Sequence, residues 1–201
     1  YAGLKLMETS GWLSDTLIKL KNSKLAIDWK NQNLDVETPI GRLVISGTGD
    51  DIHKFTDVLL SVDLGGNDTY NGQAGSTPSL QIPVSLAIDL AGDDKYLNDD
   101  EYAPSQGAAI FGAAMLLDVS GDDVYSSKRL SQGASMLGIG ILADMEGNDK
   151  YDMWTDGQGA AYFGVGLAID NKGDDKYYLW GDGQGYGGVG GVGTLVNRTG
   201  N

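Results

Sequence analysis

The chain has 201 residues, enough for one domain or an array of short repeats, and a formal net charge of −14. It contains 31 glycines, about twice the average share, and only four of its 28 acidic residues are glutamate. Because aspartate and glycine favour turns over helices, this composition excludes a helical bundle. The negative charge excludes a nucleic acid as a partner, since phosphate binding needs clustered basic residues. The absence of cysteine excludes disulfides and thiolate metal sites.

Residues 1–45 do not follow the repeat that fills the rest of the chain, and we expect them to form an N-terminal cap over its first unit. Apolar residues recur with helical spacing between Trp12 and Leu20, and Ser10 or Ser14 is available as the N-cap. Two further segments have the apolar character of strands, namely 24–29 and 43–46.

Residues 46–201 form a repeat array. Five segments share the pattern Asp-x-x-Gly-[Asp/Asn]-Asp-x-Tyr, and their first aspartates lie 26, 29, 26 and 26 residues apart. A Gln-Gly pair recurs with the same period of 26, so the spacing of 29 indicates a loop insertion between Tyr96 and Gln106. The five copies begin at Asp63, Asp89, Asp118, Asp144 and Asp170. The Gln-Gly pairs begin at Gln106, Gln132, Gln158 and Gln184.

The array is incomplete at both ends. A degenerate first copy at 46–53 has Ser46 in place of the first aspartate and His53 in place of the tyrosine. A truncated sixth copy occupies 197–201. We therefore expect the chain to be a fragment of a longer repeat protein.

The length of the repeat predicts the fold. A unit of 26 residues is too short for a propeller blade or a helical-pair repeat, and its glycines oppose helices. It suits one coil of a parallel β-solenoid, with two or three short strands joined by turns. We predict an all-β fold, a β-helix-like or β-roll-like parallel solenoid with a small α/β N-terminal cap.

The strand before each first aspartate has two faces, because side chains two residues apart share a face. We expect the larger aliphatic row to fill the interior: Leu60, Val62, Leu86, Ile88, Met115, Leu117, Ile141, Ala143, Leu167 and Ile169. We expect the smaller row to face another layer or subunit: Ser61, Ala87, Leu116, Leu142 and Ala168. The motif tyrosines are predicted to stack as a ladder, and the glutamines as an amide ladder in which each donates to its neighbour.

The acidic motifs are predicted to meet at one corner of the solenoid. Coils stack about 4.8 Å apart, where two like charges repel by about 3–4 kcal/mol at an effective dielectric of about 20. Bound cations offset such repulsion, although Asp and Asn are also ordinary turn residues that need no metal. Oxygen ligands favour calcium, whereas zinc prefers His or Cys, and His53 is the only histidine. The candidate metal ligands are Asp63, Asn67, Asp68, Asp89, Asp93, Asp94, Asp118, Asp122, Asp123, Asp144, Asn148, Asp149, Asp170, Asp174 and Asp175.

A family resemblance supports the same ion. The segment Gly65-Gly66-Asn67-Asp68-Thr69-Tyr70 resembles the Gly-x-Asp-x-hydrophobic half of the RTX nonapeptide, G-G-x-G-x-D-x-U-x. In that family, successive glycine–aspartate turns hold calcium in a parallel β-roll. The present repeat departs from the family in its period, and only the first copy keeps the Gly-Gly pair. The resemblance implies calcium at the Gly-[Asp/Asn]-Asp turns.

The leading functional hypothesis is a non-catalytic, calcium-stabilised repeat domain of a secreted or surface bacterial protein. Such a domain would act as a spacer, adhesion module or filament component, outside cells where calcium is millimolar. One alternative is a carbohydrate-binding module that uses Tyr151, Trp154, Tyr178 and Trp180. Another is a β-helical carbohydrate-active enzyme, whose acids would lie outside the pattern. Those acids are Asp99, Asp100, Glu101, Asp152, Asp156 and Asp182.

The candidate partners are a second copy or another subunit on the smaller row of side chains, and a carbohydrate. We expect no membrane insertion, because the longest apolar and glycine run, 107–117, is shorter than the roughly 20 residues of a membrane helix.

Overall fold

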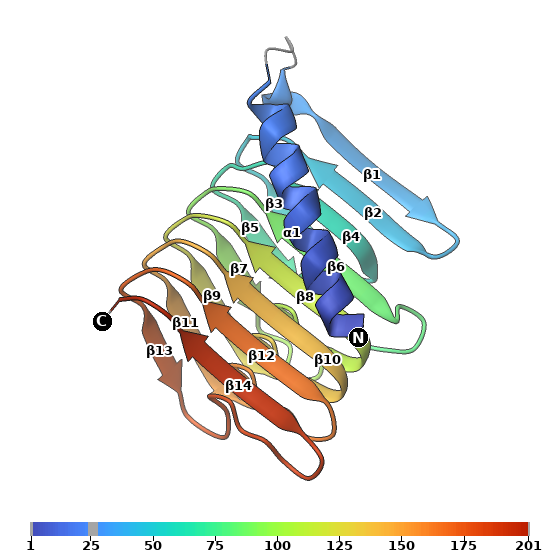
Figure 1. Cartoon of the computed structure of the whole chain (residues 1–201). Helices are drawn as coiled ribbons and strands as arrows, with labels where there is room; N and C mark the ends of the chain where they lie inside the picture. The colour runs from blue at the N-terminus through green and yellow to red at the C-terminus, as the bar shows by residue number, and fades with distance from the viewer. Residues whose placement is uncertain (1, 24–27, 201) are drawn as a thin grey trace.

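The strands of successive coils stack side by side into two sheets that face each other (Figure 1). The computed structural model describes residues 2–23 and 28–200. The large sheet contains β1 (Asn33–Thr38), β2 (Gly41–Ser46), β4 (Val58–Asp63), β6 (Val84–Asp89), β8 (Ala109–Asp118), β10 (Ser135–Asp144), β12 (Val165–Asp170) and β14 (Val192–Asn197). The small sheet contains β3 (Ile52–Phe55), β5 (Thr69–Gly72), β7 (Lys95–Asn98), β9 (Val124–Arg129), β11 (Lys150–Thr155) and β13 (Lys176–Leu179). The predicted parallel β-solenoid is confirmed.

The sequence repeat and the strand register coincide. In the large sheet, Asp63 pairs with Asp89, and the first aspartates of the following motifs continue the same pairing. In the small sheet, Tyr70 pairs with Tyr96, and the later motif tyrosines follow. The extra residues of the long spacing lie in the loop between β7 and β8, outside the strands. Equivalent side chains of successive coils therefore lie next to one another.

The prediction of which strand face fills the interior was wrong. Ala87, Leu116 and Leu142 of the smaller row pack inside with the motif tyrosines. Ile88 and Leu117 of the larger row belong to a separate cluster on the outer face of the large sheet. The reason is volume: the tyrosine rings enter the interior from the small sheet and leave room only for smaller side chains opposite them. The smaller row is therefore buried within the solenoid instead of being presented to a partner.

The tyrosine ladder is confirmed and the glutamine ladder is not. The rings of Tyr96 and Tyr125 stack with centroids 4.8 Å apart and planes 2° apart, and the other neighbouring pairs are similar. The Gln106 amide donates instead to the backbone oxygens of Tyr96, at 2.9 Å, and Ser126, at 3.1 Å. Gln132 and Gln158 bond in the same way, so each of these three glutamines ties its turn to two coils through main-chain carbonyls. Each has a left-handed backbone, with φ of 51° at Gln106, and a buried side chain.

The N-terminal segment covers both a face of the large sheet and the first edge of that sheet. Helix α1 (Ala2–Lys21) crosses the outer face of the large sheet, as Figure 1 shows. Its side chains Leu6, Leu13 and Leu17 pack on the outer aliphatic cluster, so the helix is the layer that buries that row. β1 pairs antiparallel with β2 and occupies the first edge of the same sheet.

The strand predicted at 43–46 is confirmed as part of β2, which pairs in parallel with β4 and so belongs to the first coil. Most of the strand predicted at 24–29 lies outside the described residues. Its last residue, Trp29, begins the short 3₁₀ helix η1 (Trp29–Asn31).

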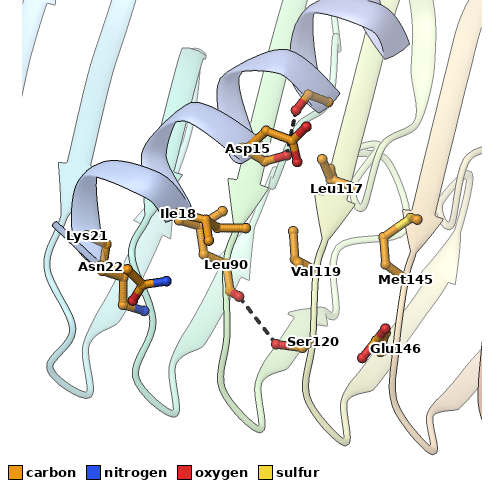
Figure 2. Close-up of a pocket in the computed structure, with 12 residues that line it drawn as sticks. Asp15, Ile18, Lys21, Asn22, Leu90, Leu117, Val119, Ser120, Met145 and Glu146 are labelled. Atoms are coloured by element: carbon orange, nitrogen blue, oxygen red, sulfur yellow. Dashed lines mark hydrogen bonds between the residues drawn. The ribbon is translucent and has the colours of Figure 1, made fainter.

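The expected N-cap serines lie within α1. The hydroxyl of Ser10 donates to the Met7 carbonyl at 2.9 Å, and Ser10 is buried against the sheet. Figure 2 shows the groove beside the helix, where Ile18 lies near Leu90 and the floor includes Leu117. Among the described residues, no helix has both the length and the apolar character needed to cross a membrane.

Candidate metal centre

One corner of the solenoid carries the acidic motif of every coil. The first aspartate of each motif is the last residue of its large-sheet strand, and the last aspartate lies one residue before the next small-sheet strand. We call the three acidic positions the first-, second- and third-position rows. The first-position row is Asp63, Asp89, Asp118, Asp144 and Asp170. The second-position row is Asn67, Asp93, Asp122, Asn148 and Asp174. The third-position row is Asp68, Asp94, Asp123, Asp149 and Asp175.

The glycine before each second position lets neighbouring turns approach closely. A Cβ atom on Gly92 would lie 1.5 Å from the carbonyl oxygen of Gly66 in the preceding coil. Gly92 also has a φ of +149°, a backbone conformation that residues with a side chain rarely adopt. Any other residue here would separate the turns, so the glycine keeps the acidic rows close together.

Side chains of the second and third positions hold each turn to its neighbours through backbone N–H groups. Asp94 Oδ1 accepts the N–H of Asp68, in the preceding coil, at 2.6 Å. Asn67 Oδ1 accepts the N–H of Asp93, in the following coil, at 2.8 Å. Both bonds recur along the array. The two ladders point in opposite directions and together fix the register of the corner.

The first- and third-position rows converge into buried clusters. Each cluster combines the third-position carboxylate of one coil with the first- and third-position carboxylates of the next, and the ligand atoms lie within 4.8 Å of one another. Neighbouring clusters share a third-position aspartate, so they form a continuous row along the solenoid axis. The four all-carboxylate clusters are Asp68–Asp89–Asp94, Asp94–Asp118–Asp123, Asp123–Asp144–Asp149 and Asp149–Asp170–Asp175. A further cluster contains Asp51, His53, Asp63 and Asp68.

Many carboxylate oxygens in these clusters are buried without a hydrogen-bond partner. Asp123 illustrates the arrangement: its Oδ1 accepts the Asp94 N–H at 2.6 Å, whereas its Oδ2 has no partner. A bare buried carboxylate oxygen is strongly destabilising unless a proton or a cation compensates for it. Among the described residues, the oxygens of this kind in the clusters are Asp68 Oδ2, Asp94 Oδ2, Asp118 Oδ1, Asp123 Oδ2, Asp144 Oδ1, Asp149 Oδ2 and Asp170 Oδ1.

The tyrosine ladder also takes part in the site, which the sequence analysis did not foresee. The Tyr96 hydroxyl donates to Asp118 Oδ2 at 2.7 Å, and the Tyr125 hydroxyl donates to Asp144 Oδ2 at 2.7 Å. The signal available in the sequence was the common period of the motifs, because each of these tyrosines reaches the first aspartate of the following motif. One oxygen of Asp118 and one oxygen of Asp144 are thus satisfied, and the Oδ1 of each is left without a partner.

Burial raises the pKa of the clustered carboxyl groups, and neighbouring carboxylates raise it further. Burial, followed by the charge of Asp63, raises the pKa of Asp68 to about 7. Burial raises the pKa of Asp123 to about 9, even though a backbone hydrogen bond opposes the shift. Burial and the charge of Asp144 raise the pKa of Asp149 to about 8. The clusters therefore favour bound protons or bound cations over free carboxylates.

The structure separates the predicted ligands into two groups. The first- and third-position rows come together in the clusters. The second-position row is exposed and lies outside them, where its side chains serve the backbone ladder. The turn geometry makes this division, because the second-position side chain points to solvent and the next one points inward.

The residues proposed for carbohydrate binding or catalysis lie outside the acidic clusters. Tyr151 is buried in the ladder and is not available to a ligand. Trp154, Tyr178 and Trp180 are exposed on the outer face of the small sheet and just beyond its strand β13. Among the acids outside the motif, Asp156 is paired with Arg129, whose Nε lies 2.6 Å from its Oδ2.

No protein-family model, curated protein or solved structure matches this chain.

Proposed function

We propose that the chain is a non-catalytic repeat domain stabilised by calcium ions, which bind between successive coils at the four all-carboxylate clusters. The observation that carries this proposal is the set of buried, unpartnered carboxylate oxygens that face one another in these clusters. A cation there would neutralise the charges that burial makes most costly. Each ion would bridge two coils and so contribute directly to the stability of the stack.

The ligand chemistry selects the ion class. The four clusters offer carboxylate oxygens only, and Tyr hydroxyls are already used as donors to them. Calcium accepts six to eight oxygen ligands in flexible geometry, and carboxylates that bind through one or two oxygens suit it. Magnesium demands a tighter octahedron and keeps its water, which a buried row of carboxylates does not favour. The resemblance of the turns to the RTX repeat supports the same choice.

A domain of this kind acts as a spacer, an adhesion module or a filament component of a secreted or surface protein. Calcium is millimolar outside cells, so sites of modest affinity are filled there. The repeated, equivalent clusters argue against catalysis by these acids, because two catalytic carboxyl groups need different environments. The activity proposed for the clusters is therefore structural.

Thermal unfolding with and without calcium tests the proposal. Calcium at about 100 times its Kd stabilises a folded protein by about 2.7 kcal/mol per site. In a domain of this size that corresponds to a rise in Tm of about 5–10 °C per site. We expect a rise of at least this size between chelator and millimolar calcium, and a smaller rise with magnesium. A difference in Tm below about 1 °C between chelator and calcium would contradict the proposal. The aspartates would then serve only to form the turns.

A second candidate function is carbohydrate binding by the small sheet. Trp154 is 57 % exposed and Trp180 is 84 % exposed on neighbouring coils, and they line a hollow of about 480 Å³ with Thr155 and Gly181. Exposed aromatic rings beside polar groups are typical of sugar-binding surfaces, because the apolar ring faces pack on the sugar. The acidic clusters lie at the corner between the two sheets. In this second function they would stabilise the fold and would not contact the sugar.

Binding to a panel of neutral polysaccharides tests the second function. Trp180→Ala should weaken binding at least about tenfold while Tm stays constant, because the removed ring is on the surface. Trp12→Ala is the matched control, since Trp12 is exposed on α1, far from the hollow along the chain. If no polysaccharide in the panel binds the unaltered protein, this function is excluded for that panel.

A further inference from the structure

The cluster at the N-terminal end of the row differs in chemistry from the other four. It contains Asp51, His53, Asp63 and Asp68, and one ligand atom of each lies within 4.8 Å of all the others. His53 is on β3, Asp63 ends β4, and Asp51 and Asp68 lie in the turns before β3 and β5. Nitrogen is therefore available here, whereas the other four clusters contain only carboxylates.

The imidazole of His53 occupies a tyrosine position of the ladder. His53 pairs with Tyr70 in the sheet, and their rings stack with centroids 4.7 Å apart. Phe55 also packs on the imidazole, with centroids 5.1 Å apart, and His53 is only 8 % exposed. The ring is thus fixed in place before any ion binds, which reduces the entropic cost of using it as a ligand.

The exchange of tyrosine for histidine changes what the ring can offer. The hydroxyl of Tyr70 donates to Asp89, and burial raises the pKa of Tyr70 well above its ordinary value, so that group acts only as a donor. A neutral imidazole also has a nitrogen lone pair. His53 Nε2 lies 3.0 Å from Asp63 Oδ2. This is a hydrogen-bond distance, and tetrahedral zinc ligands about 2.0–2.2 Å from the ion are about 3.3–3.6 Å apart, so a small shift of either side chain would admit an ion.

A second observation points to a ligand at this place. Asp68 is 1 % exposed, its Oδ1 accepts the Asp51 N–H at 2.6 Å, and its Oδ2 is buried with no partner. Asp63 Oδ1 accepts the N–H of Gly65 at 2.9 Å, which orients its Oδ2 toward the imidazole. The cluster thus combines a fixed nitrogen, an oriented carboxylate and a bare buried oxygen.

We infer that Asp51, His53, Asp63 and Asp68 form a separate site for a divalent transition metal of the zinc class, with His53 Nε2 as its nitrogen ligand. Imidazole nitrogen favours such ions over calcium, and three carboxylate oxygens complete a four-ligand set. The ion would join the first coil, through Asp51 and His53, to the second coil, through Asp63 and Asp68. The site shares Asp68 with the first all-carboxylate cluster, whereas its nitrogen ligand His53 belongs to this cluster alone.

Nuclear magnetic resonance on tag-free protein tests the site without any substitution. His53 is the only histidine of the chain, so its imidazole nitrogen signals are unambiguous. One equivalent of Zn²⁺ should shift the His53 Nε2 signal by the large amount typical of metal coordination, in the presence of millimolar calcium. A His53 spectrum that stays unchanged at saturating Zn²⁺ would overturn the inference.

The variant His53→Tyr provides the matched comparison. It installs the residue that the other coils have at this position, so the aromatic ladder is preserved. Titration calorimetry should show one Zn²⁺ site in the unaltered protein and at least a tenfold loss of affinity in the variant. The calcium-dependent rise in Tm should be equal in both proteins, which separates this site from the calcium clusters. Equal zinc binding by both proteins would show that the imidazole is not a ligand.

Discussion

At the residue scale, the third-position aspartates have two oxygens with separate functions. Asp123 Oδ1 accepts a backbone N–H and holds two coils in register. Asp123 Oδ2 has no partner, and Asp123 belongs to two neighbouring clusters. An asparagine would keep the oxygen that accepts the backbone bond and would remove the negative charge. This position therefore allows the structural and the cation-binding functions to be separated.

We expect Asp123→Asn to weaken calcium binding without disrupting the fold. Loss of one charged ligand from two shared clusters should lower calcium affinity at least about tenfold, or about 1.4 kcal/mol. In chelator, Tm should be equal to or above that of the unaltered protein, because the carboxyl groups nearby lose a repulsive neighbour. Thermal unfolding with chelator and with millimolar calcium measures both effects.

Asp122→Asn is the control for this substitution. It removes the same charge from the adjacent residue, whose side chain is exposed and lies outside the clusters. We expect its calcium-dependent rise in Tm to match that of the unaltered protein. If the two variants behave alike in calcium, the clusters do not distinguish the third position from the second.

The sequence could place the aspartates at one corner but could not separate their rows. The period predicted that Asp68, Asp94 and Asp123 would lie in neighbouring turns, and the strand register agrees. Whether a side chain in a turn points inward or outward depends on backbone angles that the motif letters do not specify. Asp93 was therefore predicted as a ligand alongside Asp94, although only Asp94 lies in a cluster.

At the element scale, the alternating pattern of a strand defines two faces without saying which face is inside. Ile88 and Ala87 alternate on β6, and the larger residue lies outside under α1. The opposite choice, which the sequence favoured, neglected the volume of Tyr96 and its equivalents on the facing sheet. Information from a second element was needed, because both faces of this strand are covered.

The packing of α1 on the large sheet provides a prediction of its own. Ser10 is buried at this interface, with its Oγ 3.3 Å from Met115 Sδ. Ser10→Leu would force the helix away from the sheet, and overpacking of this kind costs about 1–3 kcal/mol. The free energy of unfolding from urea titration should fall by about that amount.

Thr9→Leu is the comparison, because Thr9 is the preceding helical residue and is exposed. Leucine has a higher helix propensity than either residue it replaces, so propensity alone would stabilise both variants slightly. A loss of stability confined to Ser10→Leu therefore reports on the contact with the sheet. Equal stability of the two variants would mean that the helix does not pack as described.

At the scale of the whole molecule, the charge on one corner accumulates with every coil. Residues 61–201 carry 20 acidic and 7 basic side chains, whereas residues 1–60 carry 8 and 7. The clusters place part of this charge in a continuous buried row, where each carboxylate raises the pKa of the next. Protons and cations compete for the same oxygens, since a carboxylate must lose its proton to bind a metal.

This competition predicts how stability depends on pH in the absence of metal ions. The ordinary pKa of aspartate is 3.8, and burial raises the pKa of Asp94 to about 6, of Asp144 to about 7, of Asp149 to about 8 and of Asp123 to about 9. Between these limits the folded protein binds more protons than the unfolded chain, so stability decreases as pH rises. In chelator, the stabilisation should be fully present below about pH 4 and should be lost progressively between about pH 4 and pH 9.

Thermal unfolding in chelator at pH 5 and at pH 8 measures this effect, and Tm should be lower at pH 8 by at least about 5 °C. In millimolar calcium the difference should shrink or reverse, because calcium takes the place of the protons that leave. The rise in Tm caused by calcium should therefore be larger at pH 8 than at pH 5. A chelated protein whose Tm is constant over this range would show that the buried carboxyl groups do not hold protons, and the stability of the row would then need another explanation.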